Sequence, residues 1–126
     1  MPKQSSSSVR VLYALPKERV DAVARKYVER LKKQFKLRLV VLFGSYAKDT
    51  YSYGSDLDIL VVADDLPSNY GRRFVALKDT DFDVEIQPFG YTTGEFTKMR
   101  KARNRFLEEV LTEGKVLFSK LRDSSL

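Results

Sequence analysis

The chain has 126 residues, of which 43% are apolar and 32% are charged, a composition typical of one folded domain and not of a disordered chain. It contains no cysteine and no histidine, which excludes disulfides, thiolate or imidazole metal sites, and catalytic triads that use histidine. Carboxylate and backbone oxygens remain as strong metal ligands, and such hard donors favour Mg²⁺ or Mn²⁺.

The formal charge of +6 favours a polyanionic partner, such as a nucleotide, a nucleic acid or an acidic protein surface. A basic surface that only keeps the protein in solution explains the same charge equally well. The longest apolar runs, Leu39 to Phe43 and Ile59 to Ala63, are too short to cross a bilayer, and the first residues lack the apolar core of a signal peptide. We therefore expect a cytoplasmic protein that makes no contact with a membrane.

The first half of the chain predicts a tail, a helix and two strands. A run of four serines without hydrophobic periodicity indicates a disordered tail over residues 1–8, followed by a single domain over residues 9–126. Apolar residues three and four apart predict an amphipathic helix from Lys17 to Phe35, with Pro16 at its first turn. The nearly continuous apolar runs of Leu37–Phe43 and Asp56–Ala63 are typical of strands buried on both faces.

The middle of the chain is less regular. Asp64 to Gly71 is rich in turn-forming residues and predicts a loop, and the pattern from Arg72 to Lys78 fits a short helix or a strand. Asp81 to Gln87 alternates between apolar and polar residues. This alternation predicts a third strand with one polar face, ended by Pro88.

The last third of the chain predicts a helix and a closing segment. Thr92 and Glu95 have the spacing of a capping box, so a helix is expected from Thr93. Asn104 interrupts or restarts this helix, Gly114 ends it, and Lys115 to Ser119 forms a short strand or an extended tail. The order of elements predicts an α+β (mixed α/β) fold in which helices flank a small mixed sheet.

A possible phosphate site lies where the first strand ends. Gly44 and Ser45 follow the apolar run directly, at the start of an expected short helical turn, so their backbone N–H groups can face a phosphate. The Ser45 hydroxyl adds a donor. Lys48 follows one turn later and could supply a positive charge to the same phosphates.

The second predicted strand begins with two carboxylates. Asp56 and Asp58 are one residue apart, so the period of a strand places both on one face. Their mutual repulsion is tolerated where divalent cations bridge them to substrate phosphates. The polar face of the third predicted strand offers Asp83 and Glu85 as a third ligand, and we favour Glu85 over Asp83.

These residues carry a family resemblance. Gly44-Ser45, then Ser55-Asp56-Leu57-Asp58 running into Ile59-Leu60-Val61-Val62, resembles the nucleotidyltransferase superfamily of DNA polymerase beta. In particular, the chain from Lys17 to Phe118 is similar to minimal nucleotidyltransferases. The resemblance implies a polymerase beta-like nucleotidyltransferase fold, dependence on Mg²⁺, and transfer of a nucleotidyl group, often AMP from ATP.

The resemblance also assigns roles residue by residue. Gly44 and Ser45 match the residues that hold phosphate, Ser55 is a further expected nucleotide- or phosphate-binding residue, and Asp56 and Asp58 match the paired metal ligands. The family's third carboxylate, usually an aspartate, falls on Glu85, which is a departure from the family pattern.

Three functions follow from the resemblance as hypotheses. The first is an Mg-dependent enzyme that transfers AMP or another nucleoside monophosphate to a hydroxyl of a protein or other acceptor, as the antitoxin partner of a separate HEPN-domain toxin. The second is a catalytically weak or inactive module that neutralises a partner by contact. The third is a small RNA-modifying enzyme, which the positive charge favours and the lack of an RNA-binding extension disfavours.

Overall fold

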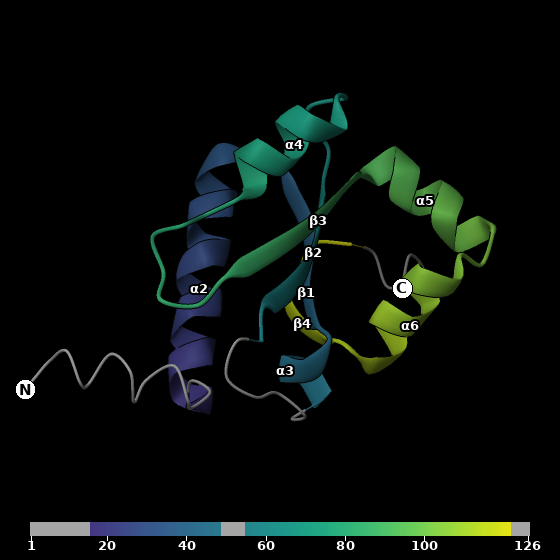
Figure 1. Ribbon diagram of the computed structural model, residues 1–126. Helices are drawn as coiled ribbons and strands as arrows, with labels where there is room; N and C mark the ends of the chain where they lie inside the picture. Colours follow the sequence, from purple (N-terminus) through teal and green to yellow (C-terminus); the bar gives the residue numbers. More distant parts are fainter. Residues whose placement is uncertain (1–15, 49–54, 122–126) are drawn as a thin grey trace, which may run out of the picture.

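The computed structural model describes residues 16–48 and 55–121, and these form a four-stranded sheet with helices on both faces (Figure 1). The strand order is β3-β2-β1-β4. The central strand β1 (Leu37–Phe43) is antiparallel to β2 (Leu57–Ala63) and to β4 (Lys115–Ser119), whereas β3 (Ile86–Thr92) is parallel to β2. The expected α+β fold with a small mixed sheet is therefore confirmed. The predicted tail, residues 1–8, lies outside the described residues.

The helices form two layers around the sheet (Figure 1). The long helix α2 (Lys17–Gln34) and the short α4 (Tyr70–Leu77) lie on one side. On the other side lie α5 (Thr93–Lys101) and α6 (Arg105–Glu113), and the single turn α3 (Ser45–Lys48) follows the end of β1. No helix within the described ranges is both long and apolar enough to span a membrane.

Local sequence signals explain most of the element boundaries. Thr92 and Glu95 form the predicted capping box, in which the Thr92 side chain accepts from the Glu95 N–H and the Glu95 side chain accepts from the Thr92 N–H. Asn104 caps α6 by accepting from the Leu107 N–H at 3.0 Å, so it restarts the helix after α5 ends. The ambiguous segment before Lys78 is a helix, which Asn69 caps by accepting from the Arg72 N–H.

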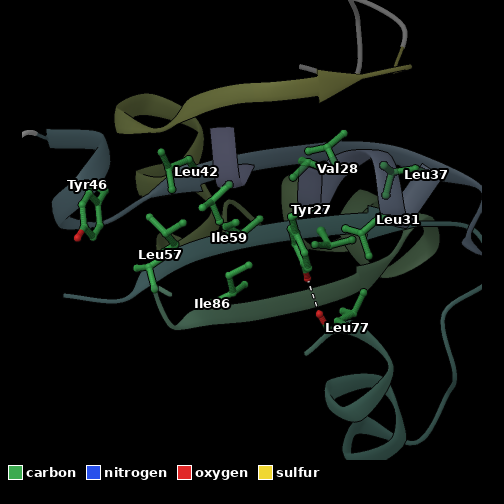
Figure 2. Close-up of a cluster of buried hydrophobic side chains, with 14 of the residues drawn as sticks. Tyr27, Val28, Leu31, Leu37, Leu42, Tyr46, Leu57, Ile59, Leu77 and Ile86 are labelled. Carbon is green, nitrogen blue, oxygen red and sulfur yellow. Dashed lines mark hydrogen bonds between the residues drawn. The ribbon is translucent and has the colours of Figure 1, made fainter. Parts of the chain in front are cut away.

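The first layer buries the face of the sheet that carries Leu57, Ile59 and Ile86 (Figure 2). Helix α2 contributes Tyr27, which is fully buried and whose hydroxyl donates to the Leu77 carbonyl at 2.6 Å. This bond joins the helix to the end of α4 across the core. The Tyr27 ring therefore supplies apolar contact area and also satisfies a buried carbonyl.

The second layer buries the opposite face of the sheet. Leu39 and Val41 of β1 and Leu60 and Val62 of β2 pack there against α5 and α6. The alternation along each strand explains why both apolar runs are continuous, because successive side chains enter different layers. The same alternation places Asp58 on the α5–α6 side, since it lies two residues before Leu60.

The prediction of a third strand at Asp81–Gln87 is wrong, because the strand runs from Ile86 to Thr92 and includes Pro88. Proline lacks an N–H and is tolerated in a strand at the edge of a sheet, which is where β3 lies. Val84 and Ile86 nevertheless belong to the core cluster that α2 covers. The alternation of apolar and polar residues therefore predicted correctly which side chains are buried, but not which residues pair with β2.

Two side chains from the α4 region cover the outer edge of β3. The Lys78 ammonium donates to the Ile86 carbonyl at 2.6 Å, and the Arg73 guanidinium donates to the Gly90 carbonyl at 3.1 Å. Arg73 is only 2% exposed and also pairs with Glu95 at 2.8 Å. Two carbonyls of this edge therefore accept from side chains and not from another strand.

The Tyr27 hydroxyl provides a test of the first layer. We expect Tyr27→Phe to lower the free energy of unfolding by about 1–2 kcal/mol, because it leaves the buried Leu77 carbonyl without its donor. Urea denaturation measures the change. Tyr70→Phe is the matched control, since Tyr70 is 66% exposed, and an equal loss in both variants would contradict the role of the buried bond.

Candidate active site

Gly44 lies in contact with Asp58 at the end of β1. Its φ angle is +77°, in the left-handed region that favours glycine. A Cβ atom at this position would overlap the Asp58 Oδ2 and would lie 3.3 Å from the Asp58 Cγ. The backbone angle is the reason that favours glycine here, whereas the overlap would only push the end of the Asp58 side chain away from its position.

Strand pairing fixes the position of the Asp58 carboxylate. Asp58 lies opposite Phe43 in the β1–β2 register, one residue before the Gly44 turn. Its side chain is half-buried, whereas Asp56, which precedes β2, is exposed. Burial, and secondly the charge of Asp56, raise the pKa of Asp58 above its usual value. The two predicted metal ligands thus lie close enough to repel each other.

Helix α3 begins at Ser45, directly beside this pair. The Gly44 carbonyl accepts from the N–H groups of Ala47 and Lys48, at 3.1 and 3.2 Å, and closes the single turn. The first N–H groups of any helix have no partner within that helix, so the N–H of Ser45 can donate to a ligand. Tyr46 itself is buried in the first layer and anchors the turn.

The other two predicted phosphate-binding residues lie on either side of this turn. Ser55 is half-buried and precedes Asp56 along the chain. The Lys48 ammonium forms an ion pair of 2.9 Å with Glu113 of α6, and this hydrogen bond raises the pKa of Lys48. Lys48 therefore remains charged beside the site, and a phosphate would have to compete with Glu113 for it.

The two candidates for the third carboxylate differ in position. The Glu85 carbonyl accepts from the Leu57 N–H at 2.8 Å, which places its backbone beside the start of β2. Its carboxylate, however, pairs with Lys78, and the Glu85 side chain is 57% exposed. Asp83 pairs with Arg19 of α2 at 2.6 Å. Backbone position therefore favours Glu85, although both carboxylates have a cation as partner.

The donor set fits a divalent cation in part. Two neighbouring carboxylates supply hard oxygen ligands, and a cation bound between them would offset both the burial of Asp58 and its repulsion from Asp56, which together raise the pKa of Asp58. Within residues 16–48 and 55–121, no three acidic side chains come close enough together to form a metal site by themselves. The remaining ligands would therefore come from substrate phosphates, or from Glu85 after it leaves Lys78.

Sequence reasoning missed the contribution of α6 to this site. Glu113 contacts Lys48, and a pocket of about 190 Å³ between Gly44 and α6 is lined in part by Phe43, Phe106 and Glu109. Gly114 is the residue in the sequence that could have indicated this contribution. A Cβ atom there would lie 3.0 Å from the Leu42 carbonyl, so α6 ends against β1. A glycine at the end of a helix is commonly explained by capping alone, which hides such a contact.

Comparison with known proteins agrees with this geometry. A family model described as "Polymerase beta, Nucleotidyltransferase" matches residues 25–123, most of the chain. The chain belongs to the polymerase beta nucleotidyltransferase family. The matched region of the family includes the Gly44 turn, both aspartates and helix α6.

Two relatives in this family carry related names. The protein adenylyltransferase MntA of Shewanella oneidensis is 34% identical over 94 residues, which cover 72% of this chain and 60% of the relative. A "putative protein adenylyltransferase" of Methanocaldococcus jannaschii is 35% identical over 102 residues, covering 81% of this chain and 93% of the relative. The chain thus spans only about 60% of the length of the Shewanella protein.

A solved structure with a related sequence shares the fold. The crystal structure described as a toxin-antitoxin with AMP-PNP is 26% identical, with a TM-score of 0.58, over 81% of this chain and 77% of that chain. The resemblance to minimal nucleotidyltransferases inferred from the Gly44 and Asp56 motifs is therefore confirmed at the level of family and fold.

The electrostatic strain at Asp58 provides a test in the metal-free protein. Because its pKa is raised in the folded state, Asp58 favours folding at low pH, and this stabilisation is lost as pH rises through the folded pKa. We expect Asp58→Asn to increase the free energy of unfolding at about pH 7, by less than about 1 kcal/mol because solvent screens the site. At about pH 3 the difference should vanish.

Urea denaturation in the presence of a chelator measures both values. Asp56→Asn is the comparison, since Asp56 is exposed and its replacement relieves only the repulsion. A loss of stability on Asp58→Asn at neutral pH would contradict the assignment of strain to this carboxylate.

Proposed function

We propose that this chain is a nucleotidyltransferase that transfers AMP from ATP to a hydroxyl of a partner protein, with Mg²⁺ or Mn²⁺ as cofactor. The observation that carries the proposal is the half-buried Asp58, held against Gly44 and next to Asp56. No ion pair among the described residues involves Asp58, so its carboxylate is available to a ligand from outside the chain. A divalent cation bound by both aspartates would offset the burial of Asp58 and its repulsion from Asp56.

The residues of the chain have separate tasks in this reaction. Asp56 and Asp58 hold the cation, which when bound supplies a Lewis acid and neutralises charge on the triphosphate. The backbone N–H and the hydroxyl of Ser45, together with Lys48, orient the phosphates. The acceptor hydroxyl loses its proton to solvent and its oxygen forms a bond to the α-phosphorus, while the bond from this phosphorus to the oxygen bridging to the β-phosphate breaks and pyrophosphate leaves.

The choice of ATP and of a protein acceptor is supported by the relatives. The names of two relatives describe protein adenylyltransferases, and the solved relative holds AMP-PNP in a toxin-antitoxin complex. We infer a separate partner polypeptide of the HEPN toxin class, whose tyrosine hydroxyl would be the acceptor. Nucleic acid is the less favoured acceptor.

A second function has one observation in its favour. Glu85 and Asp83, the candidates for the third carboxylate, are both occupied by cations of the protein itself. A domain that holds only one metal ion weakly would bind its partner without modifying it. Tight partner binding without transfer of label would support this alternative.

The transfer reaction is tested with ATP labelled at the α-phosphate, Mg²⁺ and the product of the neighbouring gene. We expect the double change Asp56→Asn, Asp58→Asn to lower label transfer by at least about a hundredfold, because the cation is lost. Asp64→Asn is the matched control, since Asp64 lies after the other end of β2, where it binds Arg38 at 2.7 Å. Transfer that survives the double change would overturn the mechanism.

The third ligand is tested by counting bound Mn²⁺ with electron paramagnetic resonance in the presence of AMP-PNP. We expect Glu85→Gln to weaken binding of a second ion by about tenfold or more, and Asp83→Asn to leave it unchanged. Lys78→Met should strengthen it, because Lys78 competes with the ion for Glu85. The opposite order for Glu85 and Asp83 would assign the ligand to Asp83.

A further inference from the structure

The pocket between α3 and α6 adjoins the proposed metal pair without including it. It opens on Gly44, whose neighbour in space is Asp58, and Phe43 on its wall lies opposite Asp58 in the sheet register. Its volume of about 190 Å³ is below the roughly 300–1,000 Å³ of sites that enclose whole drug-sized ligands. A pocket of this size is suited to one part of a larger ligand whose other part lies over Asp58.

The wall of the pocket is aromatic. Phe43 and Phe106 meet edge to face, with ring centroids 5.5 Å apart and planes at 80°. Both rings are only partly buried, although Phe89 also packs against each of them at 5.2 and 5.6 Å. Core packing therefore leaves part of these rings facing the pocket. Any nucleobase can stack on such aromatic side chains, because every base has a flat π-face.

The pocket is also lined by two carboxylates and one ammonium group, those of Glu109, Glu113 and Lys48. Glu109 and Glu113 lie one helical turn apart on α6 and both line the pocket. Glu113 pairs with Lys48, whereas Glu109 forms no ion pair within the described residues, although its charge also helps to raise the pKa of Lys48. An ionised carboxylate only accepts hydrogen bonds, so Glu109 selects a ligand that carries N–H donors.

We propose that this pocket binds the nucleobase of the substrate, that Phe106 stacks on the base, and that Glu109 accepts from an exocyclic amino group such as that of adenine. The inference rests on the proposed function, since it needs the triphosphate to lie at Gly44 and Asp58. It adds a determinant of base preference that the phosphate and metal residues cannot supply, because all nucleoside triphosphates share the same phosphates.

The test compares three ligands by calorimetry with the full chain and Mg²⁺: ATP, purine riboside triphosphate, which lacks the amino group, and inorganic tripolyphosphate, which lacks the nucleoside. The wild type should bind ATP on the order of tenfold more tightly than tripolyphosphate. It should also prefer ATP to purine riboside triphosphate.

Two variants separate the contributions of stacking and of the hydrogen bond. Phe106→Leu should bring ATP affinity close to that of tripolyphosphate, with tripolyphosphate affinity unchanged. Glu109→Met should remove the preference for ATP over purine riboside triphosphate, and because Glu109 is exposed, this variant keeps the fold even if Phe106→Leu does not. Glu108→Met is the matched control, since Glu108 instead contacts Arg100 at 3.4 Å.

The outcomes distinguish this inference from the proposed function. Equal affinities for ATP and tripolyphosphate in the wild type, or a retained amino-group preference in Glu109→Met, would overturn the base pocket while leaving the metal and phosphate site intact. Failure of the wild type to bind any of the three ligands would overturn the proposed function, and the base pocket with it.

Discussion

The contact between Gly44 and Asp58 is the constraint on which the site depends. It needs β1 and β2 to be paired in the observed register, because a shift by one residue would bring an apolar side chain to the Asp58 position. The two buried layers enforce this register, since each strand has large apolar residues on both faces. The hydrophobic core thus determines the position of the Asp58 carboxylate in the candidate active site.

Helix α6 forms the part of the site that the sheet does not provide. The close approach of Gly114 to β1 brings the end of α6 to the α3 turn, where Glu113 pairs with Lys48. The C-terminal third of the chain therefore forms one wall of the site, although its sequence carries none of the motif residues. This arrangement links the phosphate-binding turn to an element far away in the chain.

Much of this could be predicted from local sequence patterns. The boundaries of β1 and the caps at Thr92 and Asn104 depend on neighbouring residues, and these predictions are confirmed. The bounds of β3 were predicted wrongly, because the tolerance for Pro88 depends on β3 being an edge strand, which is a property of the whole sheet. The assignments of metal and phosphate roles to Asp56, Asp58 and Ser45 stay predictions.

The pairing of Glu85 with Lys78 and of Lys48 with Glu113 could not be predicted for a different reason. Each joins residues whose distance in space is set by packing, and no periodicity in the chain records it. The family motif identified which carboxylates to consider, whereas only the structure indicates which cations compete for them.

The covered edge of β3 has a consequence for how partners can bind. An exposed strand edge recruits further strands through its free N–H and C=O groups, both in ordered complexes and in aggregation. Here Pro88 offers no N–H, and Lys78 and Arg73 occupy the carbonyls of Ile86 and Gly90. The sheet therefore resists extension by a foreign strand on this side, and a protein that docks there must be recognised through its side chains.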